Sequence, residues 1–225
     1  MPTPERDAFP DNRAWLRSLS FARVSPPAAR LPDPASAPHE AFLRWLEQAV
    51  AAGIPEPHVA TLATIGADGL PQARVLMLRD LDESGWSFSG PAFSPKGRAL
   101  AARPVAALTF YWREHGRQVR VTGTVSDAGR DAAIRDFHNR SDLAQVVAEA
   151  SRQSDPLCDE QEYWAAVRDA QQRIEQEPWL VPDHWRVWRI AATIVEFWQA
   201  DPGRRHLRRR FERAGDRWTA QDLWP

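Results

Sequence analysis

Several short stretches of the sequence place cationic or amide side chains beside apolar residues, a pattern that suits an anionic, flat ligand. Arg74 precedes the apolar run Val75 to Leu78, and Arg79 follows it. A guanidinium suits phosphate oxygens, because its planar fork donates two parallel hydrogen bonds. Ser94-Pro95-Lys96-Gly97 has the form of a helix start, where free backbone N–H groups and the ammonium group of Lys96 could meet an anion. Taken alone, each stretch is also compatible with solvated charges at a strand end or on a helix surface.

Two later stretches add hydrogen-bonding groups. Gln118 lies in an alternating, strand-like run, and its amide could pair with the edge of a heterocycle because it both donates and accepts. Trp198 ends another apolar run and is followed at alternate positions by three donors, which are Arg204, His206 and Arg208. In both cases the alternative is a polar outer strand face. The pair Gln153-Ser154, which follows a predicted helix, is similarly ambiguous.

Other chemistries lack their sequence signatures. The six histidines show no metal-ligand spacing and Cys158 stands alone, so no metal and no disulfide framework are predicted. There is no glycine-rich dinucleotide fingerprint, no P-loop and no nucleophile elbow. The net charge of -1 gives no reason to expect a nucleic-acid partner. No apolar run approaches the roughly 20 residues of a membrane span and no secretory signal is recognisable, so a cytoplasmic protein without membrane contact is expected.

The elements that must position these residues are mostly strands joined by short turns, which predicts an antiparallel meander or barrel with flanking helices. The predicted strands span Val59 to Ile65, Ala73 to Leu81, Trp86 to Ser89, Val105 to Arg113, Arg117 to Val125, Trp185 to Ile190, Thr193 to Gln199, Leu207 to Ala214 and Trp218 to Leu223. One predicted helix starts at His39. The other predicted helices cover Lys96 to Ala102, Asp131 to Asn139, Leu143 to Arg152 and Glu160 to Gln176. Residues 1–38 are proline-rich and are expected to form an arm with a short helix near Arg13 to Leu19, whereas residues 39–225 form one domain.

The order and spacing of these pieces resemble the pyridoxamine 5'-phosphate oxidase family over about residues 39–225. The resemblance rests on Ala60 to Thr64, Ala73 to Leu78, Ser94 to Gly97, Leu108 to Trp112 with Arg117 to Gly123, Ala150 to Ser154, Glu196 to Gln199 and Leu223-Trp224-Pro225. It implies an FMN-binding split β-barrel and a homodimer with FMN at the subunit interface. The stretch Gly53 to Pro57 is also similar to phenazine-pathway FMN oxidases.

The resemblance also implies roles for particular residues. The FMN-binding residues would be Arg74, Leu76, Met77, Leu78, Lys96, Gln118, Gln153, Ser154, Trp198 and Arg208, with Gln153 and Ser154 supplied by the other subunit. The substrate would be contacted by Arg79, Arg140, Arg204 and His206, and the last two would lie over the flavin face, where the catalytic contacts are made.

Some positions depart from the family pattern. Pro95 replaces a basic residue that precedes the lysine, and Arg79 stands where a substrate-facing lysine is usual. Where the family grips the substrate phosphate with Tyr, Arg and Ser, this chain has Asp136, Arg140 and Ala144. A buried phosphate oxygen left without a hydroxyl donor costs about 1 to 3 kcal/mol. The pyridoxamine phosphate site is therefore altered, while the flavin site is kept.

Three functions follow from the resemblance. The first is oxidation of pyridoxamine or pyridoxine 5'-phosphate, with hydride transfer to flavin N5 and O2 as acceptor, giving pyridoxal 5'-phosphate and hydrogen peroxide; Arg79, Arg140 and Arg204 would supply the missing charge. The second is an FMN-dependent oxidase for another substrate, such as a dihydro-aromatic intermediate of secondary metabolism, which Asp136 and Ala144 favour. The third is a non-catalytic flavin-binding module.

Overall fold

A computed structural model of the 225-residue chain describes residues 10–19 and 30–225. Its helices are α1 Asn12–Ser18, α2 Pro38–Ala51, α3 Pro95–Ala102, α4 Arg130–His138, α5 Asp142–Ala150 and α6 Glu160–Gln176, with a short 3-10 turn at Arg113–His115. Its strands are β1 Val59–Ile65, β2 Pro71–Met77, β3 Asp80–Asp82, β4 Gly85–Pro91, β5 Val105–Trp112, β6 Arg117–Asp127, β7 Trp185–Gln199, β8 Leu207–Ala214 and β9 Arg217–Asp222. The mainly β class with flanking helices is confirmed.

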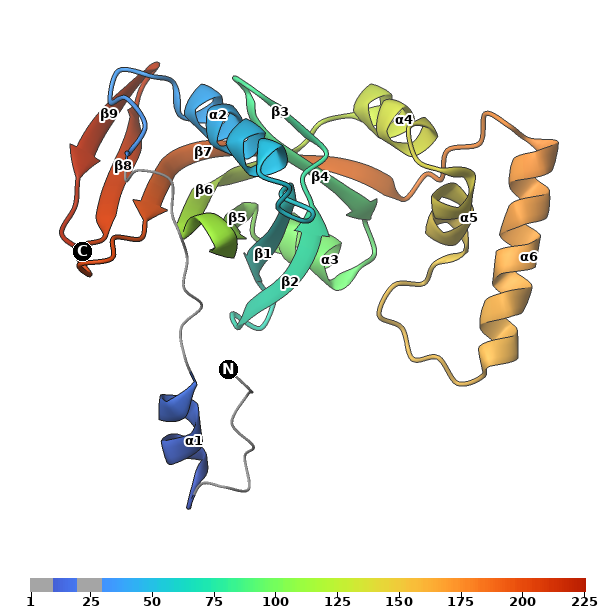
Figure 1. Cartoon of the computed structure of the whole chain (residues 1–225). Coiled ribbons are helices and arrows are strands. Elements are labelled where there is room, and N and C mark those ends of the chain that lie inside the picture. Colours follow the sequence, from blue (N-terminus) through green and yellow to red (C-terminus); the bar gives the residue numbers. More distant parts are fainter. Residues whose placement is uncertain (1–9, 20–29) are drawn as a thin grey trace.

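All strand pairs are antiparallel, and the strands form one strongly curved sheet (Figure 1). The order is β2-β1-β5-β6-β7-β4-β3, and β8 and β9 extend the sheet from the second half of β7. The long strand β7 therefore joins two regions. Its first half pairs with β4, and its second half pairs with β8.

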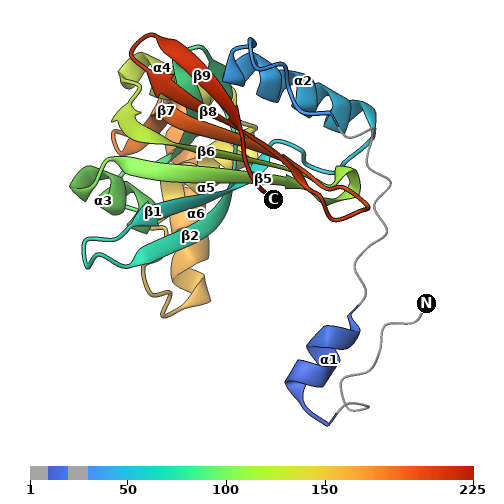
Figure 2. The same ribbon diagram turned by 90° about the vertical axis from the view of Figure 1, so that its left-hand side faces the viewer.

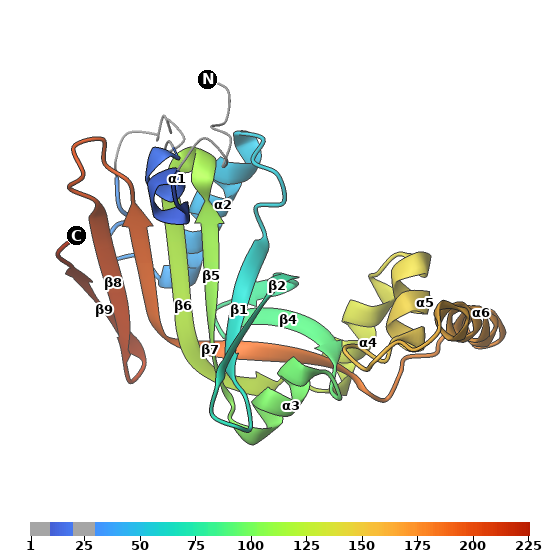
Figure 3. The ribbon, with the colours of Figure 1, turned by 90° about the horizontal axis from the view of Figure 1, so that it is seen from below.

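The helices cover different parts of this sheet. α2 lies along one end of the curved sheet (Figure 2), and its buried residues Phe42 and Trp45 enter the main core. There the Phe42 ring packs 4.6 Å from Phe110, and Trp45 packs 5.1 Å from Phe197, in edge-on contacts typical of aromatic cores. α4, α5 and α6 gather at the end remote from β8 and β9 (Figure 3). A second small cluster, which includes Phe137 and Trp185, fixes α4 against β7.

Two predicted strand boundaries are wrong. The run Ala73 to Leu81 is not one strand, because the chain changes partner at its middle: Leu78 N donates to His58 O, and Arg79 N donates to Ser87 O. β2 therefore pairs with β1, whereas β3 pairs with β4. This change of partner places Arg79 at the turning point of the chain.

Conversely, the two predicted strands between Trp185 and Gln199 are one continuous strand, β7. The register of β6 and β7 shifts at Thr122 and Gly123, so the ladder contains a bulge instead of a break. Gly123 lets β6 and β7 lie close together at the bulge, because a Cβ at that position would lie 2.1 Å from Ala191 O.

The predicted arm 1–38 lies partly outside the described residues. α2 begins at the last residue of this arm, and the predicted short helix is found as α1.

Candidate functional site

A cavity of about 520 Å³ lies between β2, β4, the start of α3 and the α4–α5 region. Seven of the residues predicted to bind cofactor or substrate line it together: Arg74, Leu76, Met77, Arg79, Lys96, Arg140 and Gln153. Leu78 instead packs against the main core, and Ser154 is exposed beside the cavity with a positive φ of 73°. The cavity therefore brings together cations predicted to bind the cofactor, Arg74 and Lys96, and two cations predicted to bind the substrate, which are Arg79 and Arg140.

Lys96 is a buried cation at the start of α3. Ser94 caps that helix, since its Oγ accepts from Gly97 N, and Lys96 Nζ lies 3.2 Å from the same oxygen. Lys96 Nζ also donates to Gln153 Oε1 at 2.8 Å. Gly90 leaves room for the ammonium group, because a Cβ there would lie 2.6 Å from Nζ. Burial and then the nearby charge of Arg74 lower the pKa of Lys96 from 10.5 to about 8.

Arg74 supplies the second cation. It projects from the inward-facing side of β2, where its Nη1 donates to Thr64 Oγ1 at 2.7 Å and its Nη2 donates to Gln72 Oε1 at 3.2 Å. Burial lowers the pKa of Arg74 as well. Within the described residues, neither Arg74 nor Lys96 forms an ion pair with a carboxylate. Two neighbouring cations without a carboxylate partner, one of them in the first turn of a helix, are suited to bind a phosphate group.

Gln153 differs from its expected position. The resemblance implied that it reaches the flavin from the other subunit, but its amide contacts Lys96 of its own chain. The reason is the path of the chain after α5, which brings Ser151 and Gln153 to the wall of the same cavity.

The opposite end of the cavity holds an ion pair. Arg79 Nε donates to Asp136 Oδ1 at 2.8 Å, and Trp185 Nε1 donates to Asp136 Oδ2 at 2.9 Å. Beside them, the guanidinium of Arg140 lies 4.7 Å from the centre of the Trp185 ring. The pKa of Arg140 is lowered by burial and by Arg79, against the opposing effect of Asp136. Trp185 was not predicted as a site residue, because nothing in its sequence neighbourhood separates it from the core tryptophans.

A second group of predicted residues lies elsewhere on the sheet. Gln118 pairs with Trp198 across β6 and β7, and Trp198 pairs with Arg208 across β7 and β8, so the three form a row. The His206 ring lies 4.9 Å from the Trp198 ring, and Arg204 adopts a positive φ of 62° in the loop before β8. None of these residues lines the cavity of about 520 Å³. The predicted site residues thus form two separate groups in one chain.

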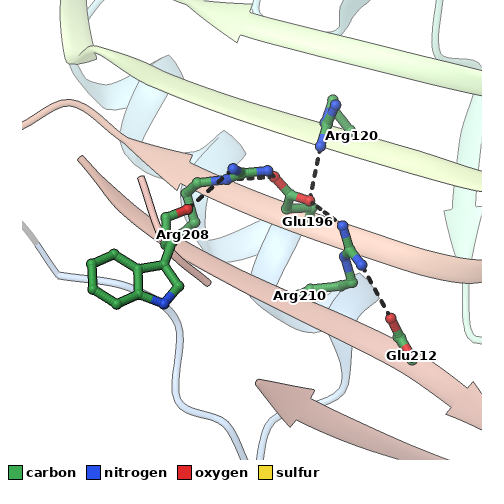
Figure 4. A network of polar contacts seen from close by, with 6 residues as sticks. Arg120, Glu196, Arg208, Arg210 and Glu212 are labelled. Atoms are coloured by element: carbon green, nitrogen blue, oxygen red, sulfur yellow. Dashed lines mark hydrogen bonds and ion pairs between the residues drawn. The ribbon is translucent and has the colours of Figure 1, made fainter. Parts of the chain in front are cut away.

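Glu196 holds Arg208 of the second group in a network with two further arginines (Figure 4). It is 4% exposed and accepts hydrogen bonds from Arg208 at 2.7 and 3.0 Å, and it forms ion pairs with Arg120 at 2.8 Å and Arg210 at 3.3 Å. Burial raises the pKa of Glu196, but hydrogen bonds from Arg208 and Arg120 outweigh it and hold the pKa below its usual value. The sequence did not predict that Glu196 pairs with these arginines. The pairing follows from the register of the strands, which places Glu196 opposite both Arg120 and Arg210.

Other kinds of site are not found in the described part of the chain. No group of three or more His, Cys, Asp or Glu side chains is placed to hold a metal ion there. None of its helices combines the length and the apolar character that crossing a bilayer requires.

Comparison with known proteins shows which family the chain resembles. Residues 46–174 match the family model described as pyridoxamine 5'-phosphate oxidase, and residues 185–225 match the pyridoxine 5'-phosphate oxidase C-terminal dimerisation region. The chain is 40% identical over 194 residues to a pyridoxine/pyridoxamine 5'-phosphate oxidase of Thermosynechococcus vestitus, covering 86% of this chain and 91% of that protein. It is 38% identical to the protein of that name from Burkholderia multivorans, covering 92% and 96%.

A solved structure extends the comparison. PhzG from Burkholderia lata, in complex with tetrahydrophenazine-1-carboxylic acid, superposes with a TM-score of 0.83 at 30% identity and covers 90% of this chain and 99% of its own. An FMN-binding protein from Nostoc punctiforme shares the fold, with a TM-score of 0.69 at 16% identity. The chain therefore belongs to the pyridoxamine 5'-phosphate oxidase family, and it is an FMN-dependent oxidase with a split-barrel fold and a C-terminal region of the dimerisation type.

Proposed function

We propose that Lys96 and Arg74 bind the phosphate of FMN and that the protein oxidises a small anionic substrate held in the same cavity. The observation that carries this proposal is the pair formed by the buried Lys96 at the start of α3 and the half-buried Arg74 of β2, which both line the cavity and have no carboxylate partner in the described residues. Leu76 and Met77, which line the cavity next to Arg74, would lie along the flavin ring. FMN supplies the redox chemistry when bound, accepting a hydride from the substrate and passing the electrons to O2.

The remaining residues would act from the second group. Gln118 would pair with the flavin ring edge, and Trp198 and Arg208 would complete the cofactor pocket. Arg204 and His206 would contact the substrate. His206 Nδ1 accepts a hydrogen bond from Asp201 N at 3.2 Å, so the neutral imidazole carries its proton on Nε2. That nitrogen would orient the substrate or move a proton at the reacting centre.

Because the two groups lie apart in one chain, we propose that the complete site forms across a homodimer. The match to a dimerisation region covers residues 185–225, which include Trp198, Arg204, His206 and Arg208. The cavity with Lys96 would then come from one subunit and these four residues from its partner. This arrangement supports the position of FMN at the subunit interface.

The substrate has two candidates. The first is pyridoxamine or pyridoxine 5'-phosphate, because relatives that this chain matches over 86% of its length carry that name; the products would be pyridoxal 5'-phosphate and hydrogen peroxide. The second is an unphosphorylated ring compound with a carboxylate, as in the PhzG complex. The ion pair between Arg79 and Asp136 favours the second, since Arg79 already has a carboxylate partner.

An anaerobic visible spectrum of the purified protein tests the first candidate. If pyridoxamine 5'-phosphate is the substrate, adding it should bleach the flavin band, because the substrate reduces the flavin and no O2 is present to reoxidise it. A persistent flavin band would leave the cofactor site in place and remove this substrate. The lack of a flavin band even after incubation with FMN would contradict the proposed function as a whole.

The pKa of Lys96 predicts how FMN affinity varies with pH. In the free protein Lys96 loses its proton above about pH 8, whereas the bound phosphate dianion would hold that proton and raise the pKa. The affinity should therefore be constant from about pH 7 to pH 8 and then weaken by up to about tenfold per unit of pH. Fluorescence titration of the apoprotein with FMN measures this.

The control variant is Lys96→Arg, since a guanidinium stays charged throughout this range. Its affinity for FMN should stay level where that of the unchanged protein falls. The assignment of Lys96 to the phosphate is wrong if both proteins show the same decline.

A further inference from the structure

The ion pair at the far end of the cavity bears on the charge of the substrate. Both carboxylate oxygens of Asp136 are engaged, Oδ1 by Arg79 and Oδ2 by Trp185. The Asp136 side chain is 8% exposed and that of Arg79 is 29% exposed. Asp136 comes from α4, Arg79 from the turning point between β2 and β3, and Trp185 from the start of β7. Arg79 and Trp185, which line the cavity, thus hold the Asp136 carboxylate in place, although Asp136 itself is not one of the lining residues.

The charges at this end can be added directly. Within one chain, Arg79 and Asp136 cancel and Arg140 is left, so this chain contributes +1, -1 and +1, which is +1. Arg140 forms no ion pair within the described residues, and its guanidinium stacks on Trp185, with its Nε 3.5 Å from Ala144 O. It therefore presents a planar donor that suits a carboxylate or one edge of a phosphate.

A ligand with one negative charge and a ligand with two are expected to bind differently at this end of the cavity. The attraction to a net charge of +1 grows in proportion to the charge on the ligand, whereas the cost of removing that ligand from water grows with the square of its charge. A dianion would also lie near the fixed carboxylate of Asp136, in a half-buried region where charges are weakly screened. The balance at this end thus favours a ligand with one negative charge.

We infer that Asp136 is a specificity-determining residue, which makes this end of the cavity select a substrate with a single negative charge, such as a ring carboxylate, over a phosphate dianion. The inference rests on the proposed function, because it places the substrate in the cavity beside FMN. It also revises the hypothesis that Arg79, Arg140 and Arg204 jointly bind a substrate phosphate. Arg79 is neutralised by Asp136, so at this end the chain itself offers only Arg140 to a substrate phosphate, and Arg204 would have to come from the partner subunit.

Calorimetric titration of the protein with benzoate and with phenyl phosphate tests the inference, with FMN in excess to fill its own phosphate site. These probes share one ring and differ in charge. The unchanged protein should bind benzoate more tightly. In Asp136→Asn, which keeps the side-chain size and an oxygen for Trp185, the affinity for phenyl phosphate relative to benzoate should rise by about tenfold or more, as expected for loss of one nearby charge.

The double variant Arg79→Gln with Asp136→Asn separates charge from shape. It removes one positive and one negative charge, so the net charge of this end stays at +1 and the preference for benzoate should return. The inference is overturned if the unchanged protein prefers phenyl phosphate, or if the single and the double variant show the same preference. The flavin band after dialysis reports separately on the FMN site, so its loss would contradict the proposed function and not this inference.

Discussion

Protein that carries Arg74→Ala together with Lys96→Ala is expected to purify colourless. These side chains are two cations that line the cavity, Lys96 from the start of α3 and Arg74 from β2, and both would donate to the phosphate of FMN. Hydrogen bonds to charged groups contribute about 1.5 to 3 kcal/mol each, so losing both should weaken FMN binding by about a hundredfold to ten-thousandfold. Absorbance of the flavin band relative to that of the protein, measured after dialysis, gives the occupancy.

Two other arginines provide the matched control. Arg98 lies on the exposed side of α3 and Arg103 follows the same helix, and neither lines the cavity. Replacing both by alanine removes as much positive charge from the same part of the surface, so a long-range effect of net charge would appear here too. This control should stay yellow. The phosphate assignment is contradicted if the cavity variant keeps full flavin occupancy.

The strands and helices could be predicted from the sequence because their signals are local. Alternation of apolar residues and glycine-containing turns predicted most strand positions, and Ser94-Pro95 predicted the start of α3. The two errors in strand assignment both concern long-range pairing. The split between β2 and β3 depends on which strand each half contacts, and the continuity of β7 depends on a bulge opposite it. Neither is encoded in local periodicity.

In the candidate site, too, local features could be predicted from the sequence, whereas contacts between distant residues could not. The types of residue at Arg74 and Lys96 suggested an anion site, and their convergence in one cavity agrees with that interpretation. The pairing of Arg79 with Asp136 was not predicted, because these residues are 57 positions apart and neither carries a sign of its partner. The sequence suggested that Arg79, Arg140 and Arg204 supply positive charge for a substrate phosphate, whereas the ion pair with Asp136 neutralises Arg79. Charge balance in a pocket depends on tertiary contacts that composition does not contain.

Mixing two inactive variants is expected to restore activity, and this outcome would follow from a site shared between subunits. One variant is Arg74→Ala with Lys96→Ala, which damages the cavity; the other is Arg204→Ala with His206→Ala, which damages the second group. In a heterodimer one composite site would receive both damaged halves, and the other would receive two intact halves. Random pairing makes half of the dimers mixed, so activity should return to about a quarter of that of the unchanged protein.

The measurement is oxidase activity after the two variants are denatured together and refolded with FMN, using a substrate that the unchanged protein turns over. Each variant refolded alone sets the background. If all site residues acted within one chain, no combination of these chains would contain an intact site, and the mixture would stay at that background. The separation of Lys96 and Gln153 from Trp198 and His206 within the chain argues for restoration, because a ligand that contacts both groups must lie between two copies of the sheet.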